Sequence, residues 1–222
     1  MPAATELLGS VDVEQLDAQA VIALTLDRLQ PNVALACSFQ KEESVLVDML
    51  LTQNPQARVF TLDTHVLFPE TYALWREIES RYGTKIEVFE GPSLGRQAAI
   101  HGESLWETKP DLCCSIRKVG PLATALSALD GWITGVRREQ SPTRADTPKL
   151  GWDERHELWK VSPLADWTDA EVWTYIEEHE LPVNPLHRQG YASIGCTHCT
   201  RPGEGRDGRW SGNDKTECGL HA

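Results

Sequence analysis

The amino-acid sequence predicts an α/β fold, built on a doubly wound and mostly parallel β-sheet. Short apolar runs, typical of strands buried on both faces, alternate with segments whose apolar residues recur at helical spacing. The length of 222 residues suits one domain of this class and is short for two. No apolar run reaches the roughly 18 residues that span a membrane, so no transmembrane segment is predicted.

The first half of the chain shows the alternation most regularly. Pro31 ends the first helical pattern, and Val33 then begins a continuous apolar run. Gly83 is placed to cap a later helix. Such strand–helix–strand units imply right-handed crossovers. The predicted helices lie at residues 11–30, 44–51, 69–82 and 94–101, and the predicted strands at residues 33–37, 58–62 and 85–89.

The second half continues the pattern with longer loops. Thr168 and Glu171 stand at the spacing of a capping box, which predicts that an amphipathic helix opens there. The remaining predicted elements are a helix over residues 116–129, a strand over 132–136, a polar loop over 137–149 and a strand over 158–161. No internal repeat and no low-complexity tract interrupts this order.

The carboxyl ends of parallel strands meet at one edge of the sheet, where ligands of such folds bind. Ser38, Asp63-Thr64 and Arg137 each follow a predicted strand and are therefore expected on this rim. The turn that begins at Ser38 leads into a helix and offers backbone N–H groups to an anion. It is not a Walker A loop, because it has no glycine and no Gly-Lys-Ser/Thr ending.

The charge distribution favours a small anionic ligand. A net charge of −12 argues against nonspecific nucleic-acid binding, which depends on a basic surface. The basic residues are nonetheless bunched, and a local cationic pocket in an acidic protein suits a small anion. The alternative is a scatter of solvated surface charges. The bunched residues are Arg117-Lys118, Arg137-Arg138, Arg144, Arg201, Arg206 and Arg209.

The compartment expected for this protein determines which role is expected for its cysteines. The stretch from Met1 to Glu6 lacks the basic flank and apolar core of a signal peptide, so a cytoplasmic protein is expected. In that compartment the six cysteines are expected to bind metal or to react rather than to form disulfides. Cys37 lies inside an apolar run and is interpreted as a small buried hydrophobe.

Four cysteines form a candidate metal site. Cys113-Cys114 and the pair Cys196 and Cys199 can supply four thiolates to a tetrahedral zinc ion or to an iron–sulfur cluster. Adjacent ligands are unusual for either group and mildly disfavour zinc, but spacing alone does not identify the metal. The alternatives are two core residues at a helix start for the first pair and a redox-active dithiol for the second.

The pattern gives one domain over residues 1–200, of which residues 1–30 are an N-terminal helical segment. Residues 201–222 are rich in glycine and charge and are predicted to form a flexible C-terminal tail. Arg206 and Arg209 place planar guanidinium groups on this tail, and these fit phosphate or sulfate oxygens. Such a segment can close over a bound substrate and open again.

Cys218 stands alone in this tail and is the candidate nucleophile. A cysteine reacts as its thiolate, which neighbouring positive charge favours. His221 and the arginines of the tail can provide that charge, whereas Glu217 opposes it. The alternative is an inert cysteine near the chain terminus.

Together these motifs resemble the assimilatory adenylyl-sulfate reductases, from about residue 33 to the C-terminus. The loops similar to that family's nucleotide-binding loops are Ser38-Phe39-Gln40, Leu62-Asp63-Thr64 and Gly135-x-Arg137-x-x-Gln140-Ser141. The motifs around the cysteines are Cys113-Cys114-x-x-Arg117-Lys118-x-x-Pro121-Leu122, Gly190-Tyr191-x-Ser193-Ile194-Gly195-Cys196-x-x-Cys199-Thr200-Arg201, Gly208-Arg209-Trp210 and Glu217-Cys218-Gly219-Leu220-His221.

The resemblance implies an adenine-nucleotide α-hydrolase-like fold, with nucleotide binding in residues 1–200 and catalysis from residues 201–222. It implies that Cys218 is catalytic and that Lys118 lies between a [4Fe-4S] cluster and the sulfate. The implied cluster ligands are Cys113, Cys114, Cys196 and Cys199. The implied substrate-contacting residues are Ser38, Phe39, Gln40, Leu62, Thr64, Lys118, Arg137, Arg206, Arg209 and His221.

The activity implied by the resemblance is reduction of adenosine 5′-phosphosulfate (APS) to sulfite and AMP. Cys218 would carry an S-sulfocysteine, thioredoxin would be the reductant, and a homo-oligomer is expected. Three alternatives stay open. The first is use of the 3′-phosphorylated substrate (PAPS), or of both nucleotides. The second is a nucleotide-binding protein with structural zinc. The third is a pyrophosphatase-like enzyme of RNA thiolation, which the absence of a Ser-Gly-Gly-x-Asp-Ser loop disfavours.

Overall fold

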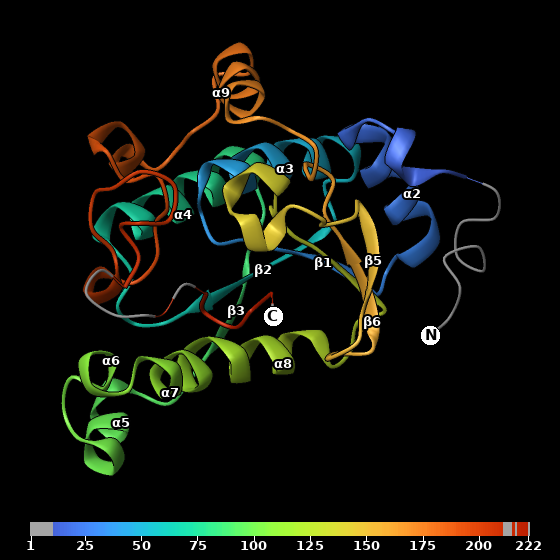
Figure 1. Cartoon of the computed structure of the whole chain (residues 1–222). Coiled ribbons are helices and arrows are strands. Elements are labelled where there is room, and N and C mark those ends of the chain that lie inside the picture. The colour runs from blue at the N-terminus through green and yellow to red at the C-terminus, as the bar shows by residue number, and fades with distance from the viewer. Residues whose placement is uncertain (1–10, 211–214, 216, 222) are drawn as a thin grey trace.

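Six strands form one sheet in the computed structural model, which describes residues 11–210, 215 and 217–221 (Figure 1). Their order across the sheet is β3-β2-β1-β4-β6-β5. Neighbouring strands run parallel except β5, which pairs antiparallel with β6. The mostly parallel sheet predicted from the sequence is therefore confirmed. The strands are β1 Val33–Ala36, β2 Arg58–Asp63, β3 Glu87–Glu90, β4 Gly131–Ile133, β5 Leu150–Asp153 and β6 Leu158–Val161.

Helices cover both faces of this sheet, as a doubly wound fold requires. In Figure 1, α2, α3, α4 and α9 lie over one face, and α8 runs along the other with α5, α6 and α7 beyond it. The bounds are α2 Ala18–Leu29, α3 Lys41–Gln53, α4 Pro69–Tyr82, α5 Leu94–His101, α6 Leu105–Thr108, α7 Pro110–Cys114, α8 Gly120–Leu126 and α9 Asp169–Glu178. None of the helices in the described part of the chain is long and apolar enough to cross a bilayer.

Local sequence signals explain most helix boundaries. The carboxylate of Asp17 accepts the backbone N–H of Ala20 at 2.8 Å and caps α2. The helix predicted over residues 11–30 therefore begins only at Ala18, after a separate 3₁₀ turn at Val13–Gln15. Gly83 ends α4 in the left-handed conformation (φ 61°), as predicted. The predicted capping box opens α9.

The helix predicted over residues 116–129 is one part of a longer helical run. α7 leads directly into a π-helical turn at Ser115–Val119, and that turn leads into α8. π-helical turns are concentrated at functional sites, and this one carries Lys118. The pattern missed α6 and α7 because each is only one turn long, and it missed β5 because that strand ends a polar loop.

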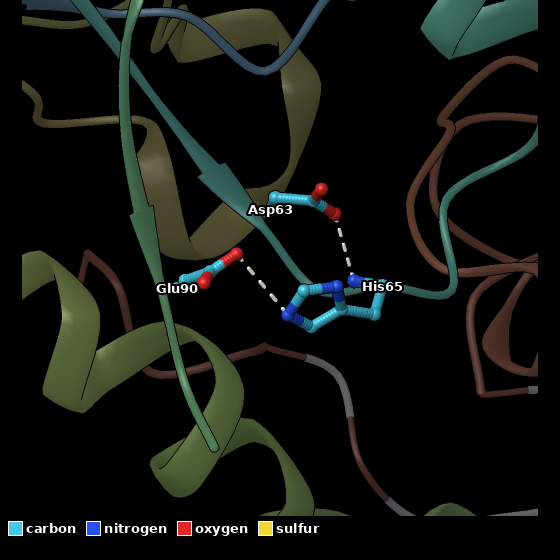
Figure 2. A group of neighbouring side chains, drawn as sticks. All are labelled: Asp63, His65 and Glu90. Carbon is cyan, nitrogen blue, oxygen red and sulfur yellow. Dashed lines mark hydrogen bonds and ion pairs between the residues drawn. The ribbon is translucent and has the colours of Figure 1, made fainter. Parts of the chain in front are cut away.

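The carboxyl ends of β2 and β3 are joined by the side chains of Asp63, His65 and Glu90 (Figure 2). The carboxylate of Asp63 accepts the His65 backbone N–H and the Tyr72 hydroxyl, both at 2.7 Å. The His65 ring nitrogen Nε2 lies 3.3 Å from the Glu90 carboxylate. These contacts fix the turn after β2 and with it the position of Thr64, which is buried at the rim of the sheet.

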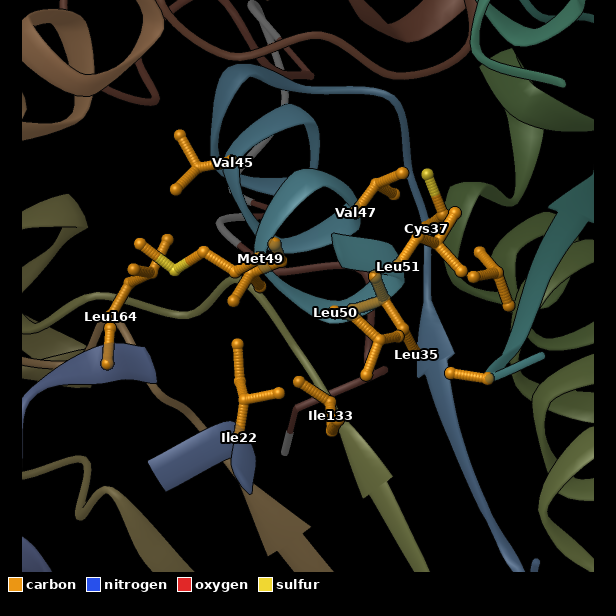
Figure 3. Packing of buried hydrophobic residues seen from close by; sticks show 14 of the residues in the cluster. Ile22, Leu35, Cys37, Val45, Val47, Met49, Leu50, Leu51, Ile133 and Leu164 are labelled. Carbon is orange, nitrogen blue, oxygen red and sulfur yellow. The ribbon is translucent and has the colours of Figure 1, made fainter. Parts of the chain in front are cut away.

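Two hydrophobic clusters hold the layers together. The larger lies between the sheet and α2, α3, α4 and α9, and Figure 3 shows Leu35 and Ile133 of the sheet close to Leu50 of α3 and Ile22 of α2. The smaller lies under α8 and contains Phe60. Each fully buried Leu, Ile or Phe side chain stabilises the fold by about 1.5–3 kcal/mol. The clusters leave the carboxyl edge of the sheet to polar side chains.

Residues 201–210 pack against the rest of the protein. The backbone N–H of Arg201 donates to the Gly208 carbonyl at 2.8 Å, and that of Trp210 donates to the Cys199 carbonyl at 3.0 Å. The side chains of Arg209 and Trp210 are buried. The expected domain boundary after residue 200 stays a prediction, and part of the expected flexible tail, at residues 211–214, 216 and 222, lies outside the described residues.

Candidate active site

A cavity opens at the carboxyl edge of the sheet, where β1, β2 and β4 end. The space between its walls measures about 1020 Å³ including the open mouth, which is enough for a ligand the size of a mononucleotide. All but one of the predicted catalytic and substrate-contacting residues line it. These are Ser38, Phe39, Gln40, Leu62, Thr64, Lys118, Arg206, Arg209, Cys218 and His221.

The turn after β1 forms one wall of this cavity. Phe39 adopts a left-handed backbone conformation (φ 60°) between the strand and α3. The side chain of Gln40 accepts the backbone N–H of Ile194 at 2.9 Å and so joins this turn to the segment before the second cysteine pair. The Ser38 hydroxyl donates to the carboxylate of Glu43 at 2.8 Å. Ser38, Gln40 and Glu43 line the cavity, so the N-terminus of α3 faces it. Anion binding by this turn stays a prediction, and in this structure the Gln40 backbone N–H donates to Glu43.

Glu43 is a buried carboxyl group in this wall that the sequence analysis did not identify. Burial raises its pKa to about 7, and the charge of Glu42 adds to the increase. The backbone of Gly135 passes so close that a Cβ there would lie 2.4 Å from a Glu43 carboxylate oxygen. A glycine at position 135 is therefore needed for the loop after β4 to approach α3.

Cations gather in one region of the cavity, its cationic end. Lys118 reaches it from the π-helical turn, and Arg144, Arg206 and Arg209 reach it from the loops. Burial lowers the pKa of Arg206 to about 10, and the charge of Arg144 contributes, so the group stays protonated at neutral pH. Arg144 was noticed among the bunched basic residues but was not predicted to line the site.

His221 is an uncharged member of the cationic end. Burial lowers the pKa of its imidazole well below the ordinary value, and the charges of Lys160, Arg144 and Arg206 act in the same direction. Its ring stacks on Trp132 with centroids 5.5 Å apart. Within the described part of the chain, its buried Nδ1 has no hydrogen-bond partner, and neither has the Nε of Arg209. Buried polar groups normally have partners, so these two atoms are available to a ligand.

The four predicted metal-ligating cysteines come together in a second, smaller cavity, which Lys118 also lines. Burial raises the pKa of both the Cys113 and the Cys199 thiol to about 11, and the neighbouring cysteines add to each increase. Burial lowers the pKa of Lys118, but its electrostatic attraction to Cys196 and Cys218 outweighs that effect and raises the pKa overall. Lys118 therefore stands in the wall between the two cavities as a cation.

The spacing of the cysteines favours a group larger than one ion. Four sulfurs on a single zinc ion lie about 3.8 Å apart, given a Zn–S bond of about 2.3 Å. Across residues 11–210, 215 and 217–221, the only three ligand atoms within 4.8 Å of one another belong to Asp63, His65 and Glu90. No three cysteine sulfurs are that close. A cluster in which each thiolate binds a different iron fits such a donor set better.

Arg137 is the exception among the predicted substrate-contacting residues, because it does not line the cavity. Its guanidinium group is buried, donates to Glu42 at 3.0 Å and to Asp169 at 2.9 Å, and pairs with Glu139 at 3.0 Å. These contacts tie the loop after β4 to the N-termini of α3 and α9. In this structure Arg137 supports the site from behind, and the neighbouring Gln140 and Arg144 reach the cavity.

Comparison with known proteins places the chain in a family. The family described as the phosphoadenosine phosphosulfate reductase domain matches residues 32–202. The chain belongs to this family. The protein named adenosine 5′-phosphosulfate reductase in Bacillus mycoides is 46% identical over 218 residues, covering 96% of this chain and 93% of that protein. The protein of the same name in Bacillus cereus matches with the same identity and coverage.

Solved structures of the family and of more distant proteins agree with the fold of this reductase-family member. A phosphoadenylyl-sulfate reductase from Candida auris, solved as a phosphate complex, superposes with a TM-score of 0.75 at 30% identity, covering 84% of this chain and 91% of that one. An FMN adenylyltransferase from Candida glabrata superposes with a TM-score of 0.62 at 16% identity over 84% of this chain and 62% of that one. The second likeness concerns the fold alone.

The raised pKa of Glu43 predicts a pH-dependent stability. Because the folded-state pKa of about 7 exceeds the ordinary 4.5, the folded protein holds a proton that the unfolded chain releases between these values. The contribution of Glu43 to the free energy of unfolding therefore falls as pH rises from about 4.5 to about 7. Glu43→Gln should gain on the order of 2 kcal/mol relative to the parent between pH 5 and pH 8. Anaerobic denaturant unfolding measures this, and parallel pH profiles would contradict it.

Proposed function

We propose that this protein reduces APS to sulfite and AMP, with thioredoxin as the electron donor and Cys218 as the nucleophile. One observation carries the proposal. Cys218 lines the same cavity as the predicted anion-binding turn after β1 and as Lys118, Arg206 and Arg209. A thiol, a set of cations and a nucleotide-sized space thus converge at the edge of the sheet where ligands of this architecture bind.

The lining of the cavity suits both parts of APS. Ala36, Phe60, Leu62, Leu122 and Trp132 line it with apolar and aromatic surface, which favours the adenine ring. The phosphosulfate would then extend toward the cations. There, guanidinium groups bind phosphate and sulfate oxygens in a bidentate manner.

The reaction then follows from the groups present. The Cys218 thiolate attacks the sulfate sulfur, a sulfur–sulfur bond forms, the bond from sulfur to the phosphate oxygen breaks, and AMP leaves. Lys118 and the arginines offset the negative charge that would repel the thiolate. A thioredoxin thiolate then attacks the Cys218 sulfur and expels sulfite. The second thioredoxin thiol resolves the mixed disulfide, which returns the Cys218 thiol and leaves thioredoxin oxidised.

The cysteine quartet would hold a [4Fe-4S] cluster in this proposal. The wide spacing of the four thiols and the position of Lys118 against both cavities support that choice. When bound, the cluster would supply fixed charge beside Lys118 and hold the helical run and the second cysteine pair together. Lys118 itself would orient the sulfate, because it is the cation that lines both cavities.

APS is preferred over PAPS as the substrate of this proposal. The relatives that are 46% identical carry the name adenosine 5′-phosphosulfate reductase, whereas the phosphoadenylyl-sulfate reductase from Candida auris is 30% identical. None of the six cysteines, all of which the structure describes, forms a disulfide, an arrangement compatible with a cytoplasmic protein. A homo-oligomer belongs to the proposal through the resemblance to the family alone.

The covalent step can be tested without thioredoxin. Anaerobic incubation with APS should add about 80 Da, one SO₃ unit, to the intact protein and nothing to Cys218→Ser. Cys37→Ser is the matched control, because this cysteine lines the same cavity but is buried in the core. An adduct on Cys218→Ser would contradict the role of Cys218, and an adduct formed with PAPS but not with APS would reverse the stated specificity.

The cluster assignment is tested by metal content. Protein purified anaerobically should contain about four iron and four sulfide per chain and absorb visible light, and Cys196→Ser should lose most of both. Cys37→Ala should retain them, because Cys37 lies outside the cysteine cavity. A colourless parent protein with one zinc per chain would instead support the structural-zinc alternative.

A further inference from the structure

Glu217, the residue before Cys218, is the one carboxylate that bridges two of the cavity arginines in the described part of the chain. Its two oxygens accept from Arg144, with Nε at 3.3 Å and Nη2 at 3.0 Å. One of them also accepts from Arg206 Nη2 at 2.9 Å. The Arg144 side chain is 10% exposed and that of Glu217 is 24% exposed, so the pair is partly shielded from solvent.

Arg144 is a firm anchor because Gln140 holds it. The amide oxygen of Gln140 accepts from Arg144 Nη1 at 2.5 Å and from the backbone N–H of Arg137. Its amide nitrogen donates to the Glu42 carboxylate at 3.1 Å and to the Gly135 carbonyl at 3.2 Å. Glu42 belongs to the buried support behind the site, and Gly135 lines the cavity. The position of Glu217 is therefore fixed relative to the sheet through two side chains.

Other contacts also hold the chain around Cys218: Lys215 pairs with Asp111, and Leu220 packs against the smaller hydrophobic cluster. Arg155 donates to the Gly219 carbonyl at 2.9 Å, and His221 stacks on Trp132. Both lie C-terminal to Cys218. On its N-terminal side, the nearest described charged contact with the body of the protein is that of Glu217 itself. The contact of Glu217 with Arg144 is bidentate and charge-assisted, which makes it stronger than a hydrogen bond between neutral groups.

We propose that Glu217 is a positioning residue, whose bridge to Arg144 and Arg206 holds Cys218 inside the cavity. Release of that bridge exposes Cys218 to its reductant. The inference rests on the proposed function for the role of Cys218, but the bridge itself can be measured independently of sulfur chemistry. In this proposal Arg144 holds Glu217 in addition to lining the substrate cavity.

Accessibility of Cys218 is the direct readout. We would measure its alkylation by iodoacetamide in the intact, cluster-containing protein, quantified on the peptide that contains Cys218. Glu217→Gln and Arg144→Gln should each raise the rate about tenfold, the factor expected for loss of a charge-assisted hydrogen bond. Arg144→Lys should lie between them and the parent. Arg138→Gln, on the same loop but paired with Glu14, should leave the rate unchanged.

We call the bridge from Glu217 to Arg144 and Arg206 the latch. The pair of variants distinguishes a loss of this latch from an electrostatic effect on the pKa of the Cys218 thiol. Glu217→Gln removes a negative charge near Cys218, whereas Arg144→Gln removes a positive one. An effect on the thiol pKa alone would change the two alkylation rates in opposite directions. A latch raises both rates, and the double variant should exceed neither single variant by more than about twofold. Opposite changes, or no change, would overturn the proposal.

Two further measurements keep the test decisive. Added salt should raise the alkylation rate of the unmodified protein, because screening weakens the ion pair, and this needs no substitution. In a single turnover with saturating APS, Glu217→Gln should form the Cys218 adduct about tenfold more slowly, while the Kd of AMP changes less than about threefold. If the parent forms no adduct, the proposed function fails and the alkylation result still judges the latch.

Discussion

Lys118 stands in the wall that two cavities share, and the rest of the site depends on that position. The π-helical turn at Ser115–Val119 carries it directly after Cys113 and Cys114. The smaller cavity, on one side of Lys118, is therefore lined by buried thiols. The nucleotide-sized cavity lies on the other side. Burial lowers the pKa of a lysine so enclosed, but here its electrostatic attraction to Cys196 and Cys218 outweighs burial and raises the pKa overall.

Carboxylates compensate the arginines both behind the site and beside the cavity. Arg137 is held by Glu42 and Asp169, and Glu217 bridges two arginines within the cavity. Removing one partner from such a buried pair is costly, because the other charge is left without compensation. The same arrangement keeps His221 neutral, since cations and burial both disfavour its protonation. The site thus places charged and uncharged hydrogen-bond donors around the same cavity.

The sequence was sufficient for five of the six strands and for most helices, because these follow from periodicity, and its motifs predicted most of the residues that line the cavity. It assigned Arg137 to the cavity, since residues after a parallel strand share one rim. Only the fold shows that the Arg137 side chain turns toward Glu42 while Arg144 reaches the cavity. Glu43 was also missed, because its burial depends on the approach of Gly135 from a distant segment.

In the proposed reaction, Cys218 and the phosphosulfate meet in one cavity and AMP leaves before any reductant acts. A rapid-quench measurement of AMP, with APS in excess and thioredoxin absent, tests this order of steps. We expect a burst of about one AMP per chain, with no free sulfite until thioredoxin is added. Sulfite released together with AMP before the reductant, or no AMP until the reductant is present, would contradict it.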